Sequence, residues 1–182
     1  MNIYYSSPYS TDKLLGRAYN DLCSIVPNDD DFICLIDGDV MFLNSNYGHI
    51  IEAAIKNNPQ YQLFTCYASR IKNPQQMYQG KISEDPNIIH HWEIAQRNAI
   101  ENKGKVKELK QLISGHVMIF SKWLWKQIPF VEQTKRGTIL GIDNVFSSQV
   151  LKSGYRIGLI EDLYVLHYYR MKQGIDYREH LK

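Results

Sequence analysis

The stretch Phe32-Ile-Cys-Leu-Ile-Asp37-Gly-Asp39-Val-Met-Phe-Leu43 decides how the rest of this chain can fold. It is an apolar run interrupted by two aspartates one residue apart. The run predicts a strand buried on both faces that ends at the acids. In open α/β sheets, ligands bind at the carboxyl ends of strands. Two carboxylates there repel each other and are costly to desolvate, so the pattern favours a divalent metal ion carrying a phosphorylated ligand.

Alternatively, Asp37-Gly38-Asp39 is only a polar turn, because Asp and Gly are common in turns and Gly38 would allow the chain to turn there. The apolar sequence on both sides of the acids favours the metal site over a plain turn.

Composition sets the class of protein. A chain of 182 residues favours one domain with a full core, and we expect a single domain over residues 1–182. The formal charge of +2 is too close to neutral to indicate a nucleic-acid partner. Cys23, Cys34 and Cys66 are scattered, which predicts reduced, buried thiols and a cytoplasmic location. The sequence contains no apolar run that approaches membrane-spanning length and no signal-peptide pattern.

The remaining patterns predict alternating strands and helices. A short strand at 3–5 is followed by a helix from about Asp12 to Ile25, for which Thr11 is the expected cap. This order implies a parallel pair with a crossover helix, and we expect an α/β fold with a mostly parallel central sheet. The sequence also predicts helices at 47–57, 88–101, 121–128 and 143–152, strands at 61–67, 112–120, 155–160 and 163–166, a long polar loop at 68–87, and a solvated lysine-rich segment at 103–110.

Three further features could join the two aspartates. His167 closes the last predicted strand, and imidazole suits manganese alongside carboxylates, although a lone histidine there could simply be hydrogen-bonded. Asp143 stands where a helix N-cap belongs, but a carboxylate can also act as a general base. Ser114, Gly115 and His116 are a small-residue entry to a strand, which either admits a ligand to the backbone or allows close packing.

The loop after the first strand should lie beside the Asp37 end of a parallel sheet. Tyr5 or Tyr9 could stack there on a base, or belong to an ordinary core. Arg17 could pair with a diphosphate, or lie solvated on an exposed helix face.

Four motifs follow one another along most of the chain: Leu15-Gly-Arg-Ala-Tyr-Asn20, Phe32-Ile-Cys-Leu-Ile-Asp37-Gly-Asp39, Ser114-Gly-His-Val-Met-Ile-Phe120, and Gly141-Ile-Asp-Asn-Val-Phe146 with Gly154-Tyr-Arg156. In this order they resemble nucleotide-sugar glycosyltransferases of the GT-A fold, close to glycosyltransferase family 2. The matching features of that family are a Gly…Ala-x-Asn helix, an Asp-x-Asp motif, an acceptor-side Gly-Gly strand and a Glu-Asp helix. His167 matches a late histidine that some relatives use as a metal ligand.

The resemblance implies a metal-dependent, inverting transfer of a sugar from a nucleotide-diphosphate donor, expected to be uridine-linked, to a hydroxyl of a saccharide acceptor. It implies that Asp39 and His167 hold Mn²⁺ or Mg²⁺ and that Asp143 deprotonates the acceptor hydroxyl. Nucleotide binding would fall to Asp37, Ser6, Pro8, Tyr9, Arg17 and Asn20, and acceptor binding to Ser114, Gly115 and His116.

Some positions depart from the family pattern. Ile142 stands in place of the Glu of the Glu-Asp pair, and Tyr19 in place of an arginine. Two rival readings therefore stay open. One is a haloacid-dehalogenase-type phosphatase, with Asp37 as nucleophile, Asp39 as general acid/base and Glu161-Asp162 as its second acid pair. The other is a non-catalytic nucleotide- or glycan-binding module in which Asp143 is only a helix cap.

The last residues, 168–182, mix tyrosine with arginine and lysine. We expect a peripheral tail there, which could touch a membrane or a lipid-linked acceptor, with at most peripheral membrane contact.

Overall fold

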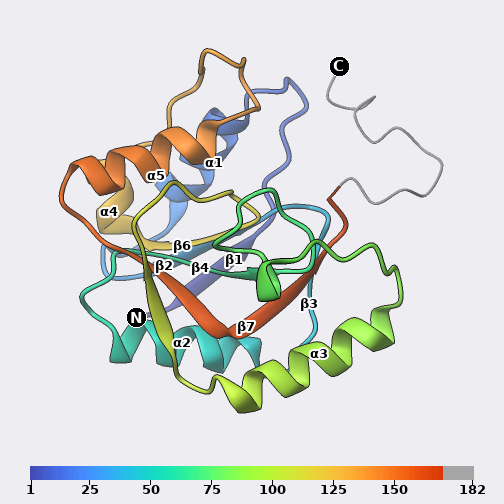
Figure 1. The fold of residues 1–182 in the computed structure, drawn as a ribbon. Coiled ribbons are helices and arrows are strands. Elements are labelled where there is room, and N and C mark those ends of the chain that lie inside the picture. Colours follow the sequence, from blue (N-terminus) through green and yellow to red (C-terminus); the bar gives the residue numbers. More distant parts are fainter. Residues whose placement is uncertain (170–182) are drawn as a thin grey trace.

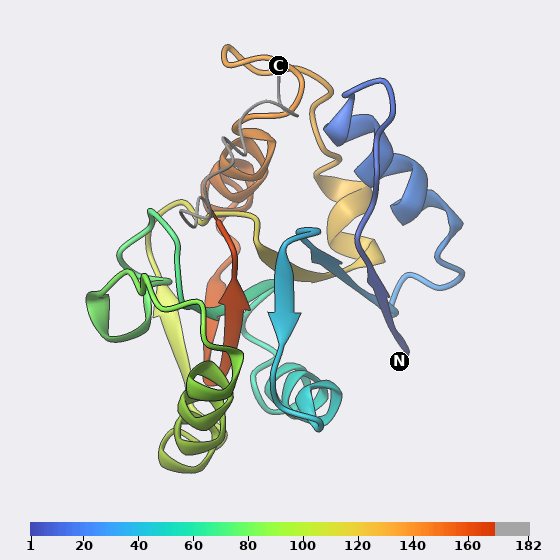
Figure 2. The same ribbon diagram turned by 90° about the vertical axis from the view of Figure 1, so that its right-hand side faces the viewer.

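A computed structural model describes residues 1–169 as an α/β structure built on one seven-stranded sheet (Figure 1). Helices cover both faces of the sheet (Figures 1 and 2). Most of the tail predicted over residues 168–182 lies outside the described residues. The strands are β1 (Ile3–Ser6), β2 (Phe32–Ile36), β3 (Val40–Phe42), β4 (Leu63–Ala68), β5 (Val106–Leu109), β6 (Val117–Ser121) and β7 (Ile157–His167). The helices are α1 (Leu15–Ile25), α2 (Tyr47–Asn57), α3 (Ile88–Glu101), α4 (Lys122–Gln127) and α5 (Ile142–Lys152), with a 3₁₀ turn η1 (Tyr78–Gly80).

The α/β class is confirmed, but the sheet is mixed rather than mostly parallel. Its order is β1-β2-β6-β4-β7-β3, with β5 also paired to β7. Only β1–β2 and β4–β7 are parallel pairs. The other four pairs are antiparallel. Strand β6 lies between β2 and β4 and runs opposite to both, and β3 and β5 each run antiparallel to β7.

The core forms two layers against the sheet. On one face, Cys23 of α1, Leu124 of α4 and Phe146 of α5 pack with the strands in one cluster. On the other face, α2 contributes Ile51 to a second cluster and α3 contributes Ala95 to a third. All three cysteines are buried free thiols, as expected. Among residues 1–169, no helix combines the length and the apolar character needed to cross a bilayer.

Several local expectations need correction. Helix α1 begins at Leu15 rather than near Asp12, because Ser10 and Asp12 hold the preceding backbone in a turn by accepting the N–H of Leu14. The two predicted final strands form one strand, β7, whose pairing register with β4 shifts between Cys66 and Tyr67.

The lysine-rich segment predicted as solvated surface contains β5. Its lysine, Lys107, is exposed, while Leu109 is buried and the strand pairs with β7. The alternation of apolar and polar residues in β5 spans only four residues, so the sequence pattern did not distinguish this strand from the charged residues around it.

Candidate metal and catalytic site

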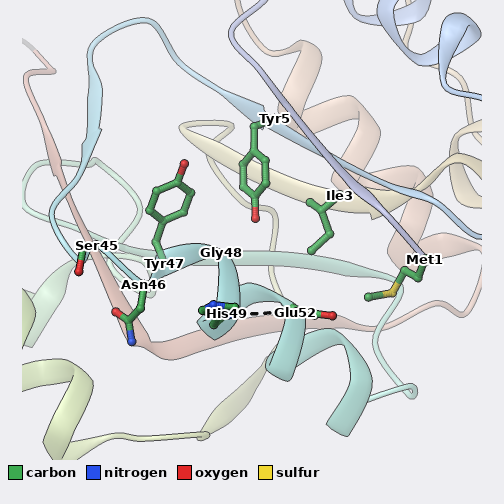
Figure 3. Close-up of a pocket in the computed structure, with 9 residues that line it drawn as sticks. All are labelled: Met1, Ile3, Tyr5, Ser45, Asn46, Tyr47, Gly48, His49 and Glu52. Atoms are coloured by element: carbon green, nitrogen blue, oxygen red, sulfur yellow. Dashed lines mark ion pairs between the residues drawn. The ribbon is translucent and has the colours of Figure 1, made fainter.

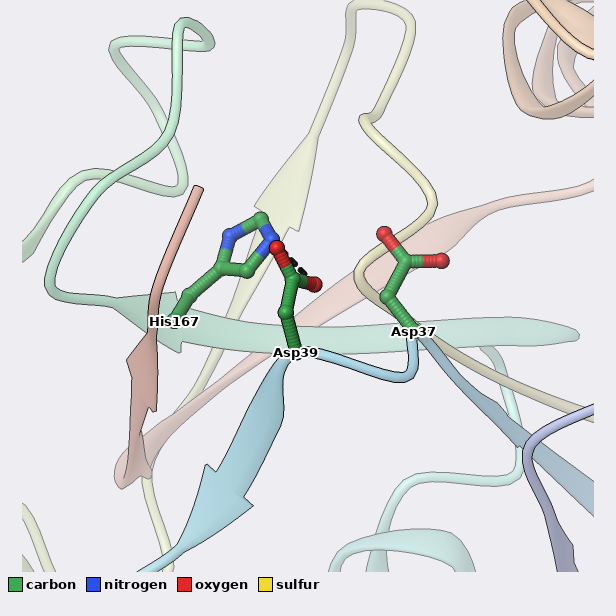
Figure 4. A group of neighbouring side chains, drawn as sticks. All are labelled: Asp37, Asp39 and His167. Atoms are coloured by element: carbon green, nitrogen blue, oxygen red, sulfur yellow. Dashed lines mark ion pairs between the residues drawn. The ribbon is translucent and has the colours of Figure 1, made fainter. Parts of the chain in front are cut away.

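The ends of β2 and β7 bring Asp37, Asp39 and His167 together (Figure 4). Asp37 directly follows β2, and its N–H extends the ladder to β6 by donating to the carbonyl of His116 at 3.0 Å. Val40 of β3 is the register partner of His167, and the N–H of Tyr168 donates to the Asp39 carbonyl at 3.0 Å. The antiparallel β3–β7 pair therefore sets the second aspartate beside the histidine.

The three side chains lie close enough together for one cation to contact all of them. One ligand atom from each lies within 4.8 Å of the others. His167 Nε2 is 3.2 Å from Asp39 Oδ1. His167 is buried, Asp37 is partly buried and Asp39 is exposed, so the site opens to solvent on the Asp39 side. Two carboxylates and an imidazole form a donor set that suits Mn²⁺ and related ions, and these residues fit the ion that the sequence implied.

The electrostatics of the two aspartates differ. Burial raises the pKa of Asp37 to about 7; the His167 charge opposes this shift, while the charges of Asp39 and Asp143 add to it. Burial also acts to raise the pKa of Asp39, but the hydrogen bond and charge of His167 outweigh it and the net pKa is lowered. Asp37 is thus a carboxylate whose negative charge is poorly compensated by the protein, which is what a cation site requires.

A second histidine supports the first from inside the core. The rings of His116 and His167 stack with centroids 5.6 Å apart and an interplanar angle of 20°. His116 is fully buried, and burial, with the nearby His167 charge, lowers its pKa to about 3. The side chain of His116 has no exposed surface, and its role in acceptor binding stays a prediction. The ring of His116 packs against His167 from the core side.

Asp143 is held at the edge of this centre by the backbone. Gly115 N–H donates to Asp143 Oδ2 at 2.8 Å. A Cβ added to Gly115 would lie 2.8 Å from the Cβ of Asp143, so this approach depends on glycine. Burial raises the pKa of Asp143, against backbone hydrogen bonds from Asn144 and Gly115. Asp143 is not the N-cap of α5: that position is Gly141, with φ 81°.

Gln76 is a central residue that the sequence analysis missed. Its side chain is fully buried, and its amide clamps one residue at two points: Oε1 accepts Ser114 N–H at 2.7 Å, and Nε2 donates to Ser114 O at 3.0 Å. Nε2 also donates to Thr65 Oγ1 at 2.8 Å and lies 3.4 Å from His116 Nδ1. Gln76 thereby fixes the segment that holds Asp143 and backs His167. Nothing local distinguishes it within a polar loop.

The predicted nucleotide residues divide into two groups. Ser6, Pro8, Tyr9 and Arg17 line one cavity of about 420 Å³ between the loop after β1 and helix α1. A Cβ built on Gly38 would lie 3.7 Å from Ser7 Oγ, so this loop borders the Asp37-Gly38-Asp39 turn, as expected.

Asn20, in contrast, has a structural role on the same helix. Its amide donates to Phe130 O at 2.8 Å and accepts from Trp125 Nε1 at 2.8 Å and Phe130 N at 3.0 Å. These bonds tie α1 to α4 and the segment after it, and Asn20 does not line the cavity shared by Tyr9 and Arg17; its contact with a nucleotide stays a prediction.

A second hollow, of about 450 Å³, lies between β1 and the start of α2 (Figure 3). Tyr5, one of the two tyrosines considered for base stacking, lines this hollow and not the cavity beside Tyr9. The ring of Tyr5 contacts the edge of Tyr47 with centroids 5.5 Å apart. None of the predicted site residues lines this hollow.

The acid pair that a phosphatase would need is engaged elsewhere. Asp162 Oδ2 accepts the N–H of Gly104 at 2.7 Å, and Glu161 accepts from the hydroxyl of Tyr67 at 3.3 Å. Both lie inside β7, five and six residues before His167, where the pairing register of β7 with β4 shifts.

No protein-family model matches this chain, and a search of curated proteins also finds no match.

Proposed function

We propose that this protein is a metal-dependent, inverting glycosyltransferase that uses a nucleotide-diphosphate sugar. The observation that carries the proposal is the convergence of Asp37, Asp39 and His167 within 4.8 Å, with Asp143 coupled electrostatically to Asp37. The loop after β1 borders the same turn through Ser7, and the cavity between this loop and α1 offers the ring of Tyr9 and the cation of Arg17 to a nucleotide. We propose a uridine nucleotide as the donor and a saccharide hydroxyl as the acceptor.

Each residue has a chemical task in this proposal. Asp39 and His167 would hold Mn²⁺ or Mg²⁺, with Asp37 close enough to bind the ion or the ribose. The ion would supply Lewis-acid stabilisation of the diphosphate. Asp143 takes the proton of the acceptor hydroxyl while that oxygen attacks the anomeric carbon. The bond from that carbon to the diphosphate oxygen breaks, the nucleotide diphosphate leaves with the electron pair, and the configuration inverts.

The properties of Asp143 suit a general base. Its pKa is raised by burial, and a base is most effective when its pKa approaches the working pH. Gly115 fixes one carboxylate oxygen and so orients the group. The departure at Ile142 has a packing explanation: its side chain is 1% exposed and belongs to the core cluster that includes Phe146, so an acid there would be buried.

Specific contacts in the structure argue against the two rival functions. Asp162 accepts the N–H of Gly104 and Glu161 accepts the hydroxyl of Tyr67, and these contacts argue against their use as the second acid pair of a phosphatase. Asp143 lies in the first turn of α5 and not at its N-cap, so the cap role assumed for a non-catalytic module does not account for its position. We also propose a reducing, cytoplasmic location, because all three cysteines are free and buried.

The experiment that tests this proposal is calorimetric titration of UDP, with and without Mn²⁺, into the wild type and Asp39→Ala. We expect Mn²⁺-dependent binding that the substitution removes. Asp30→Ala, which changes an exposed aspartate in the loop before β2, is the matched control and should bind like the wild type. If UDP, GDP and other nucleoside diphosphates all fail to bind in the presence of Mn²⁺, the glycosyltransferase proposal is wrong.

A second step separates an enzyme from a binding module. Purified protein with Mn²⁺ and a panel of UDP-sugars and saccharide acceptors should release UDP. Release of inorganic phosphate from a phosphomonoester without any nucleotide would instead support the phosphatase.

A further inference from the structure

Helix α3 presents an apolar stripe on the side facing away from the sheet. Ile89, Trp92 and Ile100 are 68%, 50% and 78% exposed. The helix lies at the periphery of the fold, below the sheet in Figure 2. Ile89 and Ile100 are eleven residues apart, about three helical turns, so they lie on the same side. A row of large apolar side chains in water is a typical mark of an interaction surface.

The inner side of the same helix is fully used. His91 contacts the hydroxyl of Tyr164 through Nδ1 at 2.6 Å, and the amide of Asn98 donates to the carbonyl of Glu161 at 2.8 Å. Ala95 packs in the cluster that contains Tyr164. The fold therefore fixes α3 rigidly on β7 and leaves the outer stripe without a partner within residues 1–169.

Two opposite charges stand within the stripe. Glu93 and Arg97 are exposed, are one turn apart, and lie on the outer side with Ile89 and Ile100. Neither has an ion-pair partner in the described part of the chain. The stripe is thus apolar at both ends and carries one negative and one positive side chain in the middle.

This arrangement is complementary to itself. When two copies of a helix pack antiparallel about a two-fold axis, each residue lies level with one at the same distance on the other side of the axis. For an axis passing beside Ala95, Glu93 lies level with Arg97 of the second copy. Ile89 then lies level with Ile100 to within one residue, and Trp92 also comes within reach of the Arg97 guanidinium.

We infer that α3 is the interface through which two copies of this chain associate, as an antiparallel helix pair related by a two-fold axis. The partner is a second copy because the stripe's own charges supply the complement. A single helix face is small beside a standard interface of about 800 Å² per partner, so the dimer is weak and depends on protein concentration. This inference does not depend on the proposed enzymatic function.

Sedimentation velocity over a concentration series, at low and high salt, tests the inference. The wild type should shift from monomer to dimer with rising concentration, and less so at high salt. Glu93→Arg and Arg97→Glu should each weaken dimerisation by roughly tenfold or more, because each change places like charges together twice in a symmetric interface. The double variant Glu93→Arg/Arg97→Glu should restore wild-type association, because the charges are then exchanged and not removed.

Ile25→Gln is the matched control for Ile100→Gln, which tests the apolar residues of the α3 stripe. Ile25 is 75% exposed at the end of α1, close to the exposure of Ile100, so only Ile100→Gln should weaken the dimer. Far-ultraviolet circular dichroism checks that each variant keeps its helices. A wild type that stays monomeric at every concentration, or a double variant that stays as weak as the single ones, overturns the inference. Monomeric protein that binds anionic lipid vesicles through Trp92 also overturns it and makes a membrane the occupant.

Discussion

Gly115 and Asp143 approach so closely that position 115 has no room for a β-carbon. The Gly115 N–H binds Asp143 Oδ2 at 2.8 Å, and an added Cβ would lie 2.8 Å from the Asp143 Cβ. The contact joins the entry to β6 with the first turn of α5, and it decides where the carboxylate points.

Gly115→Ala should therefore displace Asp143. We expect turnover to fall sharply, and the free energy of unfolding to drop by roughly 1 to 3 kcal/mol, because the new methyl group overpacks a fixed contact. Mn²⁺ binding by Asp39 and His167 should persist. Gly48→Ala is the control, since a Cβ added to this glycine of α2 would lie 3.4 Å from the Tyr5 hydroxyl and away from Asp143, so turnover should not change. Wild-type turnover by Gly115→Ala would show that the contact does not orient the base.

Asp143→Asn should separate chemistry from binding. The amide keeps the size of the side chain but cannot accept the proton of an acceptor hydroxyl. We expect turnover to fall by roughly 10²- to 10⁴-fold, while calorimetry finds the affinity for UDP and Mn²⁺ unchanged. An Asp143→Asn variant with full turnover would assign the base to another residue.

Asp37 should make the metal-free protein less stable at neutral pH. Burial is the chief cause that raises its folded pKa to about 7 from the ordinary value of 3.8. The folded state therefore holds more protons than the unfolded state between those values, and stability falls as pH rises from about 4 to 7. Asp37→Asn should remove this loss and stabilise the chelator-treated protein by roughly 1 to 3 kcal/mol at pH 8.

Urea unfolding at pH 4.5 and pH 8 measures this effect. The gain from Asp37→Asn should be small at the lower pH, where the wild-type carboxyl is largely protonated in the folded state. Asp30→Asn, at an exposed position, should show no such pH dependence. Equal gains at both pH values would mean that the charge of Asp37 is not the cause.

Gln76→Leu should lower both the stability of the fold and the affinity of the Asp37, Asp39 and His167 cluster for Mn²⁺. The substitution removes the partners of the half-buried N–H and carbonyl of Ser114, which should lower the free energy of unfolding by roughly 2 to 5 kcal/mol, measured with urea. Affinity for Mn²⁺ should also weaken, because Gln76 borders His116, which stacks on His167. Asn73→Leu removes a hydrogen bond to Leu112 O from the same loop and should leave Mn²⁺ affinity unchanged.

Arg17 and Asn20, three residues apart on α1, should respond oppositely. Asn20→Ala removes three hydrogen bonds to the segment around Phe130 and should lower the free energy of unfolding by roughly 2 to 4 kcal/mol. Arg17→Ala changes an exposed side chain in the cavity and should weaken UDP binding at unchanged stability. Loss of stability in Arg17→Ala without loss of binding would contradict this division.

Local patterns in the sequence determined much of the architecture. Apolar residues at helical spacing fixed α2 at Tyr47–Asn57 and α3 at Ile88–Glu101, both as predicted. The apolar run before Asp37 placed the two acids at the end of a buried strand. Such patterns succeed because the burial of one face repeats within a few residues.

Only the tertiary structure decided which strands lie side by side and which residues surround Asp37 and Asp39. Periodicity reports which face of an element is buried, but not which strand lies beside it, so the insertion of β6 between β2 and β4 had no local sign. Gln76 and Ser114 are 38 residues apart, and Gly115 and Asp143 are 28 apart. Hydrogen bonds over such separations form only once the chain is folded, which is why the sequence named Asp37, Asp39 and His167 but not the glutamine that supports them.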